Sequence, residues 1–379
     1  MTGMNEPTQV PGGDANGEAP LEITTFYPRE VEVIDPRQIE VGRTNVPGSY
    51  VPRRSVRSNR RVALVLFLAT CVSVFLAGMR PGKGILDLYG RDPSDPSLPP
   101  FSELFLNGLT YFGAVMTILI AHEMGHYLQA RRYRVPATMP YFIPFPITPI
   151  GTMGAVIVQG AGVANRKSLF DIAVSGPLAG LVFALPITML GIWKAKIGMT
   201  EPPPGEPIWG MPLIFEWLLH WIRGPLPGGA WLADNPWLFA GWVGIFITAL
   251  NLMPIGQLDG GHILYTLIGR RAHRVAIGLL FAAMGYMILT GQISYALMVV
   301  LLFVAGPRHP PTADDNVPLG AGRIAVGWLT LAFVLIGFTL NPISVMPRIE
   351  RRPPPRPPAV QSDGVEVRLA PVTKPTGPS

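Results

Sequence analysis

Long apolar runs, separated by short polar or proline-rich segments, occupy the middle of the chain and leave its two ends without sustained hydrophobic patterning. A helix needs about 20 apolar residues to cross a hydrocarbon core of roughly 30 Å. The longer apolar runs are 62–79, 105–130, 169–193, 236–256 and 324–341. Two shorter runs are 275–290 and 293–306. The shorter pair forms either two tilted crossings or a tight hairpin. The pattern predicts an all-α polytopic membrane protein with six to seven transmembrane helices.

The segment between the second and third runs is apolar but does not suit a helix. "VPATMPYFIPFPITPIG", residues 135–151, contains five prolines, which a helix interior does not tolerate. Non-helical backbone at membrane depth occurs only where it is buried in protein or lines a wet cavity. We therefore expect a re-entrant β-hairpin-like segment here, with "GTMGAVIV" at 151–158 as one strand.

The ends of the chain have the composition of tails. Residues 1–60 are rich in Pro, Gly and charge, which predicts a flexible N-terminal tail, and neither a secretory signal nor a transit peptide fits them. Residues 346–379 include "RRPPPRPP" and predict a disordered, Pro-rich C-terminal tail. Between the tails, residues 61–345 form the expected transmembrane domain. Within it, the Trp-rich stretch 207–222 suits a helix lying in the membrane interface.

Composition supports the membrane assignment and limits the partners. The chain is 49% hydrophobic and 14% charged, and its formal net charge is +6. The arginines flank the apolar runs and do not form a basic face interleaved with aromatics, so we expect a lipid bilayer and no nucleic acid as partner. The single cysteine, Cys71, excludes a disulfide or a cysteine-based zinc site within one chain.

Basic clusters predict the orientation in the membrane. "RRSVRSNRR" directly precedes the first run and, by the positive-inside rule, places the N-terminal tail in the cytoplasm. Further clusters follow the second run, precede the third and follow the fourth, where the same orientation requires them. A bacterial inner membrane is the preferred location, with an organelle of bacterial descent as the alternative.

Three ionisable residues interrupt the second run, in "AHEMGHY". His122 and His126 are four residues apart, so on a helix they project from one face and can bind the same ion. Glu123 points at a different angle, where its carboxylate can reach a water molecule next to a metal. Two histidines that bond to neighbouring helices are the alternative, but ionisable groups at this depth are costly and usually functional.

A zinc enzyme needs a third protein ligand. "TALNLMPIGQLDGGHILY" offers Asn251, Asp259 and His262 where Pro254 and neighbouring glycines break the fourth run. We take Asp259 as the ligand, with a role as helix N-cap as its alternative. His262 suits a supporting or structural role. Asp171 is expected to pair with Arg166 or Lys167 or to cap the third span, and is the substitute ligand.

The segments "HEMGH", "LFDIAVSGPLAG" and "NLMPIGQLDGG" together resemble the site-2 protease family of intramembrane zinc metalloproteases over residues 103–265. The resemblance implies one Zn²⁺ held by His122, His126 and Asp259, with Glu123 as catalytic carboxylate. It also implies that Asn251 lies near the substrate or the developing oxyanion. The chain resembles the compact form of the family, without an evident PDZ or CBS domain. "SGPLAG" is more typical of helix packing than of chemistry.

The function expected on these grounds is cleavage of transmembrane segments of other membrane proteins. An exposed strand edge at Gly151, Thr152 and Gly154 is the predicted substrate-binding element, because it can pair with an unwound substrate. A membrane transporter or metal-handling protein that uses the same His and Asp side chains as an ion site is the alternative, and an inert family member that only binds partners is a third. Glu123 discriminates among them, since an ion relay does not need it.

Overall fold

The computed structural model describes residues 58–84, 87, 98–160, 162–198, 207–227, 230–292, 294–306 and 309–345. The predicted tails, 1–60 and 346–379, lie outside the described residues except for positions 58–60. Almost all of the described residues therefore belong to the predicted transmembrane part of the chain.

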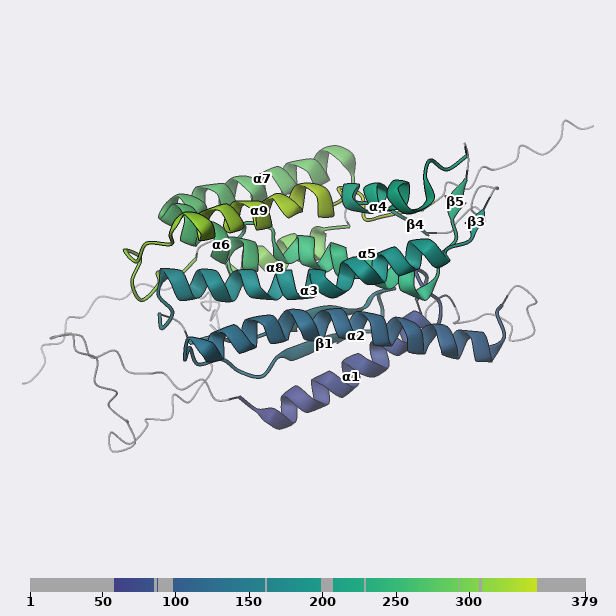
Figure 1. The fold of residues 1–379 in the computed structure, drawn as a ribbon, viewed down its shortest axis with the longest axis horizontal. Helices are drawn as coiled ribbons and strands as arrows, with labels where there is room; N and C mark the ends of the chain where they lie inside the picture. The colour runs from purple at the N-terminus through teal and green to yellow at the C-terminus, as the bar shows by residue number, and fades with distance from the viewer. Residues whose placement is uncertain are drawn as a thin grey trace, which may run out of the picture. The chain divides into compact units, whose positions relative to one another are not determined.

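Helices form most of the described structure (Figure 1). In chain order they are α1 (Arg60–Gly78), α2 (Phe101–Arg132), α3 (Arg166–Lys194), α4 (Leu213–Arg223), α5 (Pro236–Asn251), α6 (Asp259–Ile268), a short 3-10 turn η3 (Gly269–Arg271), α7 (Ala272–Thr290), α8 (Ala296–Ala305) and α9 (Ala321–Gly337). The strands pair in twos: β1 (Tyr141–Phe145) with β2 (Gly151–Val156), β3 (Ile197–Gly198) with β5 (Trp231–Leu232), and β4 (Pro207–Trp209) with β6 (Ile343–Val345).

Several helices have the length and composition of membrane spans. Four helical stretches among the described residues qualify: Arg60–Gly78, Phe101–Arg132, Arg166–Lys194 and Asp259–Thr290. The last is not one straight helix, because Gly269 adopts a positive φ of 62° and ends α6 before α7 begins. A mostly helical fold with helices able to cross a membrane is thus confirmed, whereas six to seven crossings remain a prediction.

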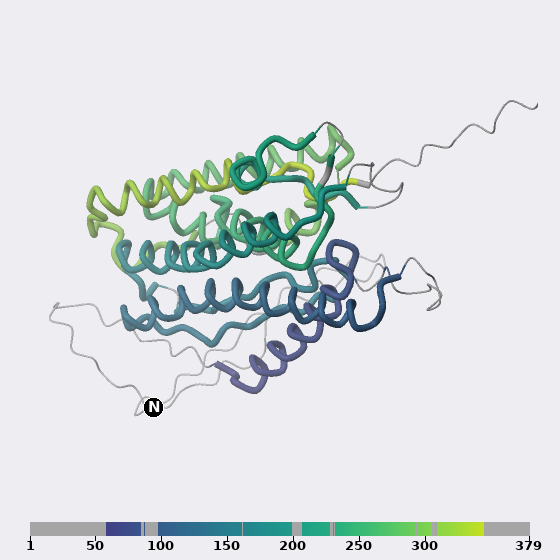
Figure 2. The backbone as a smooth tube through the Cα atoms, turned by 45° about the vertical axis from the view of Figure 1, so that its right-hand side comes forward, coloured from purple at the N-terminus to yellow at the C-terminus, as the bar shows by residue number. Residues whose placement is uncertain are grey.

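The centre of the bundle consists of α2, α3 and α5, and Figures 1 and 2 show α2 and α3 side by side along most of their length. Small residues allow this close approach. A Cβ on Gly241 of α5 would lie 2.4 Å from the Thr188 hydroxyl oxygen of α3, and one on Gly244 would lie 2.7 Å from Ile118 of α2. The buried Thr188 hydroxyl donates to the Ala184 carbonyl within its own helix at 2.7 Å, so this contact leaves no polar group unpaired.

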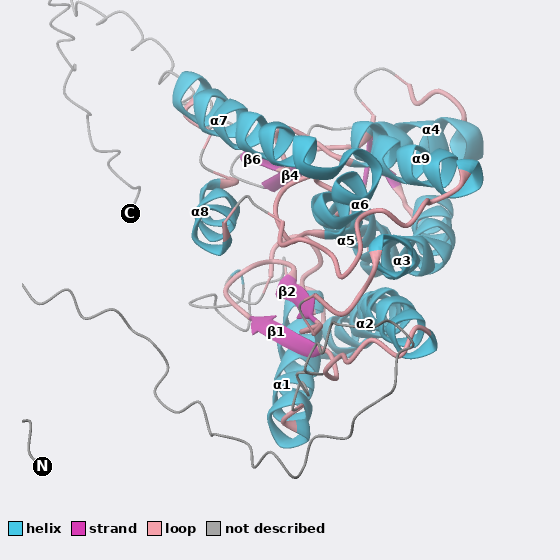
Figure 3. Ribbon diagram, turned by 90° about the vertical axis from the view of Figure 1, so that its left-hand side faces the viewer, coloured by secondary structure: helices cyan, strands magenta, loops and turns pink. Residues whose placement is uncertain are grey.

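The proline-rich segment forms the expected antiparallel hairpin of β1 and β2 beside α1 (Figure 3). Its register shifts between Phe142 and Pro144, since Pro144 has no N–H to offer the ladder. The Ser73 hydroxyl of α1 donates to the Gly151 carbonyl at 2.5 Å. The strand predicted at 151–158 is therefore present over Gly151–Val156, while its re-entry into a membrane remains a prediction.

At one end of the bundle, the beginning of α9 is bound to the beginning of α3. The guanidinium of Arg323 donates to both carboxylate oxygens of Asp171, at 2.7 and 2.9 Å, and the Tyr133 hydroxyl donates to the same carboxylate. The expectation that Asp171 pairs with Arg166 or Lys167, or caps the third span, is wrong. Asn165 caps α3 instead, and the partner of Asp171 comes from a helix far along the chain.

The opposite end is closed by the β3–β5 and β4–β6 pairs and by α4. Arg223 of α4 donates to the carbonyls of Ile192 and Ala195 at 3.1 and 2.8 Å, which satisfies the end of α3. Trp217 and Trp221 of α4 are 58% and 73% exposed, while Phe215 and Leu219 are buried. This amphipathic helix lies within the stretch expected at a membrane interface.

Candidate metal centre

Two histidines of α2 face one point inside the bundle. His122 and His126 lie one turn apart and are both buried, with 4% and 6% of their surface exposed. Their Nε2 atoms are 3.1 Å apart. α2 packs against α3 and α5, and both histidines are among its buried residues.

Asp259 joins them from the other side. It is the first residue of α6, and its Oδ2 lies 3.2 Å from Nε2 of His122 and 3.3 Å from Nε2 of His126. The turn that carries it is tight: a Cβ on Gly260 would lie 1.9 Å from the Leu252 carbonyl oxygen. Asp259 makes no capping hydrogen bond, and Leu258 occupies the N-cap position, so the N-cap alternative does not describe its side chain.

The three separations fit a common metal ion. Ligand atoms about 2.0 Å from a tetrahedral zinc ion stand about 3.3 Å from one another, close to the 3.1, 3.2 and 3.3 Å measured here. Two neutral imidazoles and one carboxylate also match the ligand types of catalytic zinc sites, which leave a fourth position open. His122, His126 and Asp259 are the residues that would hold the ion.

A third helix orients one of the ligands. The Nδ1 atom of His126 lies 2.7 Å from the carbonyl oxygen of Ile172 in α3. This contact places the imidazole proton on Nδ1 and leaves Nε2 free to bind a metal. Ile172 could not be predicted from the sequence, because a backbone carbonyl has no residue-specific signal.

The glycines of "SGPLAG" make that contact possible. A Cβ on Gly176 would lie 2.0 Å from Nε2 of His126, and one on Gly180 would lie 3.3 Å from the His122 ring. The packing role expected for this motif therefore takes place directly against both histidines. This small-residue motif is the one feature of the sequence that could have indicated the approach of α3 to the metal centre.

Glu123 and Asn251 flank the three ligand candidates. Glu123 is buried, with 5% of its surface exposed, and is close enough to interact electrostatically with His122, His126 and Asp259. Asn251, the last residue of α5, places its side-chain nitrogen 3.4 Å from Nε2 of His122. A carboxylate and a neutral amide are thus available beside the point that the ligands share.

The sequence around this centre matches a known family. Residues 110–291 match the model of peptidase family M50, the site-2 protease family. Residues 110–291 belong to peptidase family M50. This span contains His122, Glu123, His126, Asn251 and Asp259, so the resemblance to site-2 proteases is confirmed.

Plant proteins are among the curated relatives of this chain. The protein named "Probable zinc metalloprotease EGY1, chloroplastic" from Arabidopsis thaliana is 30% identical over 299 residues, which cover 74% of this chain and 53% of that protein. "Probable zinc metalloprotease EGY2, chloroplastic" from Oryza sativa subsp. indica is 30% identical over 252 residues, covering 64% of this chain and 45% of that protein. The chain spans about half the length of the curated relatives it matches.

Two further candidates lie outside the M50 metal centre. The Asp171 carboxylate is held by Arg323 and does not reach the histidines, so it is not the substitute ligand. His262 contacts His309, with Nδ1 and Nε2 of the two rings 2.5 Å apart. His262, in the first half of α6, therefore belongs to a second group of side chains that includes His309 and Tyr265.

The predicted substrate-binding residues occupy different environments in β2. Gly151 is buried against α1, where a Cβ would lie 2.9 Å from Ser73 and Ala77. The Thr152 hydroxyl donates to the Ile143 carbonyl of β1 at 2.9 Å. Gly154 adopts a positive φ of 90° and has no heavy atom within 4 Å of where a Cβ would lie. All three residues are buried, so the predicted edge is not exposed at these positions, and of the two glycines only Gly154 has room for a Cβ.

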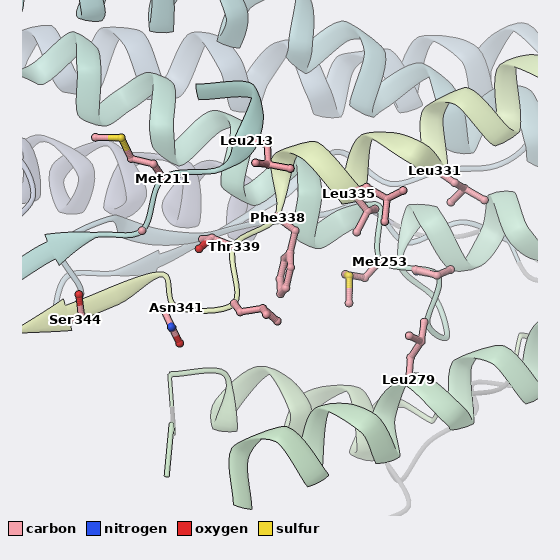
Figure 4. A pocket seen from close by; sticks show the side chains of 14 residues that line it. Met211, Leu213, Met253, Leu279, Leu331, Leu335, Phe338, Thr339, Asn341 and Ser344 are labelled. Atoms are coloured by element: carbon pink, nitrogen blue, oxygen red, sulfur yellow. The ribbon is translucent and has the colours of Figure 1, made fainter. Parts of the chain in front are cut away.

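A cavity of about 710 Å³ lies behind the turn between α5 and α6 (Figure 4). Met253 and Pro254 of that turn line it, together with Leu279 of α7 and Phe338 beyond α9. The cavity contains none of the metal-ligand candidates. The same turn packs against α7 beside the cavity, through Ile255 with Ala276 and Leu280.

Proposed function

We propose that the protein is an intramembrane zinc endopeptidase that hydrolyses peptide bonds within or near transmembrane segments of other membrane proteins. The observation that carries this proposal is the near-equilateral arrangement of His122, His126 and Asp259 inside a bundle of membrane-length helices. Membership of the M50 family and the zinc metalloprotease names of its curated relatives support it.

The depth of the centre favours a membrane substrate. His122 and His126 lie about 15 and 9 Å from the end of α2 at Arg132, at 1.5 Å per residue. A hydrocarbon core is about 30 Å thick, so a membrane that surrounds the bundle would place the centre within one leaflet. A peptide bond that reaches it comes from a membrane-embedded or membrane-proximal segment.

The residues around the ion divide the catalytic tasks. A zinc ion in this position would polarise the substrate carbonyl and make water more acidic. Glu123 takes the proton from the attacking water and afterwards gives it to the leaving amine. The Asn251 amide donates a hydrogen bond to the developing oxyanion. The Ile172 carbonyl keeps His126 in the tautomer that leaves Nε2 unprotonated.

A substrate helix must unwind before it is cut, because its peptide carbonyls are hydrogen-bonded within the helix. The edge of β2 near Gly154 offers strand pairing in exchange for those bonds. The view in Figure 3 has β2 on the side of β1 toward α5 and α6. Gly154 is buried, but no heavy atom lies within 4 Å of where its Cβ would be.

Charge supports an orientation for the bundle. Basic residues at the end where α3 and α9 begin outnumber those at the other end in the described part of the chain: Arg60, Arg61, Arg131, Arg132, Arg134, Arg166, Lys167, Arg270, Arg271, Arg274 and Arg323, against Arg80, Lys83, Lys194, Lys196 and Arg223. By the positive-inside rule the first end faces the cytoplasm of a bacterium, or the corresponding side of an organelle of bacterial descent. A bacterial inner membrane is our preferred location.

Glu123→Gln tests the proposal against an ion-transport role. Wild type, Glu123→Gln and His126→Ala are purified, their zinc content is measured, and cleavage of single-span membrane proteins is assayed in proteoliposomes. Glu123→Gln should keep about one zinc per chain and lose activity by a factor on the order of 10² or more, while His126→Ala should lose zinc. Glu103→Gln, at the exposed start of the same helix, is the matched control. Full cleavage by Glu123→Gln would contradict the proposal.

A further inference from the structure

A second cavity, of about 500 Å³, lies at the far end of α6 from the metal centre. Arg166 at the start of α3, Arg270 and Arg271 of η3, and Asp315 from the segment before α9 all line it. α6 has ten residues, which separates this cavity from Asp259 by roughly 14 Å of helix. The cavity is therefore distinct from the metal centre.

The cavity has an excess of positive charge that hydrogen bonds and ion pairs among its own residues do not neutralise. Arg166 donates through Nε to the Thr266 carbonyl at 2.6 Å and through one Nη to the Leu267 carbonyl at 3.3 Å. A guanidinium has five N–H donors, so this fixed side chain retains donors for another acceptor. Arg270 and Arg271 are exposed, and neither forms an ion pair within 4.0 Å among the contacts of the described residues.

The one acid of the cavity is already engaged. The Asp315 carboxylate accepts hydrogen bonds from the Tyr265 hydroxyl at 3.0 Å and from the Thr312 hydroxyl at 2.6 Å. These bonds hold Asp315 in place on the wall, so it offsets one of the three arginine charges without closing the cavity. A ligand with one or two negative charges complements the positive charge that remains in the cavity.

We propose that this cavity binds the phosphate group of an anionic phospholipid. Guanidinium groups match the geometry of phosphate oxygens, and basic pockets between helices on the cytoplasmic side of a membrane suit anionic headgroups. Leu267 and Ile268 line the same cavity and give it an apolar wall for the part of the lipid next to its phosphate. The position at the ends of α3 and α6 corresponds to headgroup level in the orientation proposed above.

The bound phosphate would link α3 to the turn that follows α6. Arg166 belongs to α3, whereas Arg270 and Arg271 precede α7. A single anion between them relieves the repulsion of three like charges. Lipid binding should therefore stabilise the folded chain independently of zinc and of catalysis.

Native mass spectrometry of the full chain in nonionic detergent tests this inference. The protein is titrated with phosphatidylglycerol or phosphatidylcholine, and the bound lipids are counted. Wild type should bind phosphatidylglycerol in preference to phosphatidylcholine. The double variant Arg270→Gln/Arg271→Gln should bind it about 25-fold more weakly, at about fivefold for each arginine lost near the headgroup. Asp315→Asn should bind it more tightly than wild type.

Arg274→Gln is the matched control, because Arg274 is exposed, carries the same charge and does not line the cavity. It should bind phosphatidylglycerol within about twofold of wild type. An equal loss in Arg274→Gln would mean diffuse attraction to a basic surface and would overturn the site. So would the absence of any preference for phosphatidylglycerol. Displacement of the lipid by millimolar inorganic phosphate would overturn the assignment to a lipid and indicate a free anion.

Discussion

The Nδ1 atom of His126 lies 2.7 Å from the carbonyl oxygen of Ile172, so α3 determines which nitrogen of a metal-ligand candidate in α2 is free. The contact depends on the absence of a side chain one turn later in α3, where Gly176 faces the same imidazole. Metal geometry and helix packing are therefore coupled at this position. Groups that orient a ligand in this way usually affect metal affinity by 10- to 100-fold.

Gly176→Ala should weaken zinc binding. Its Cβ would lie 2.0 Å from Nε2 of His126, so either the ring or α3 must move and the hydrogen bond to Ile172 lengthens. We expect the zinc affinity to fall by at least about tenfold, measured by competition with a chelator on protein whose helical content is verified by circular dichroism.

Gly113→Ala is the control for this change. Gly113 is exposed on α2 and has no heavy atom within 4 Å of where a Cβ would lie, so alanine there should stabilise the helix by up to about 1 kcal/mol and leave zinc affinity unchanged. If Gly176→Ala kept the wild-type zinc affinity, the coupling between α3 and His126 would be disproved.

The parts of the site that sequence predicts are those whose chemistry is local. The spacing of His122 and His126 requires only a helix, and Asp259 stands out because it lies in an apolar context. The strand at Gly151–Val156 is predicted for a similar reason, because prolines break the helical pattern around it, whereas substrate binding at Gly154 stays a prediction. These positions needed no knowledge of distant parts of the chain.

The features that sequence did not predict are pairings between distant elements. Arg323 binds Asp171 from 152 positions away, and Arg166 reaches the Thr266 carbonyl from 100 positions away. Many arginines lie near the spans, and nothing in the pattern says which carboxylate or carbonyl each will meet. The positions of α9 and α6 relative to α3 determine these two pairings. Those positions depend on the packing of the whole bundle.

The pairing of Arg323 with Asp171 should contribute measurably to stability. The side chains are 34% and 13% exposed and bond through two parallel hydrogen bonds, a geometry stronger than most exposed ion pairs. A double-mutant cycle with Arg323→Gln and Asp171→Asn should give a coupling of about 1–2 kcal/mol in unfolding free energy. Arg132→Gln, which changes an exposed arginine at the same end, should cost less than about 0.5 kcal/mol. A coupling near zero would show that α9 is held by its apolar contacts alone.

The hairpin can be tested separately from the metal. Gly154 adopts a φ of 90°, so proline, which requires a φ near −65°, would disrupt the strand itself. Gly154→Ala is milder: its Cβ meets no atom, and the backbone strain is about 1–3 kcal/mol. We expect cleavage of a single-span substrate to fall severalfold while zinc content is unchanged, because the strand edge must shift.

Gly162→Ala provides the comparison for Gly154→Ala. Gly162 adopts a φ of 70°, also borders open space and lies outside the hairpin strands. It should retain wild-type cleavage despite a similar backbone strain. If the two variants lost activity equally, the effect of Gly154→Ala would be a general loss of stability and not a defect in the substrate edge.

The segment before α9 should loosen on acidification. His309 is 8% exposed and contacts His262, while Tyr265 and His273 stack near it and Asp315 lies close by. Burial lowers the pKa of His309 from its ordinary value of 6.5. The detached segment therefore binds a proton that the docked segment excludes, so docking is strongest above pH 6.5 and weakens as the pH falls from 6.5 toward the lowered pKa.

Hydrogen exchange of residues 309–320, corrected for intrinsic rates, should show less protection at pH 5.5 than at 7.5. His309→Gln, which keeps a hydrogen-bond donor, should reduce this difference, and α5 should show none. Equal protection at both pH values in wild type would mean that the docked segment accommodates the charged imidazole.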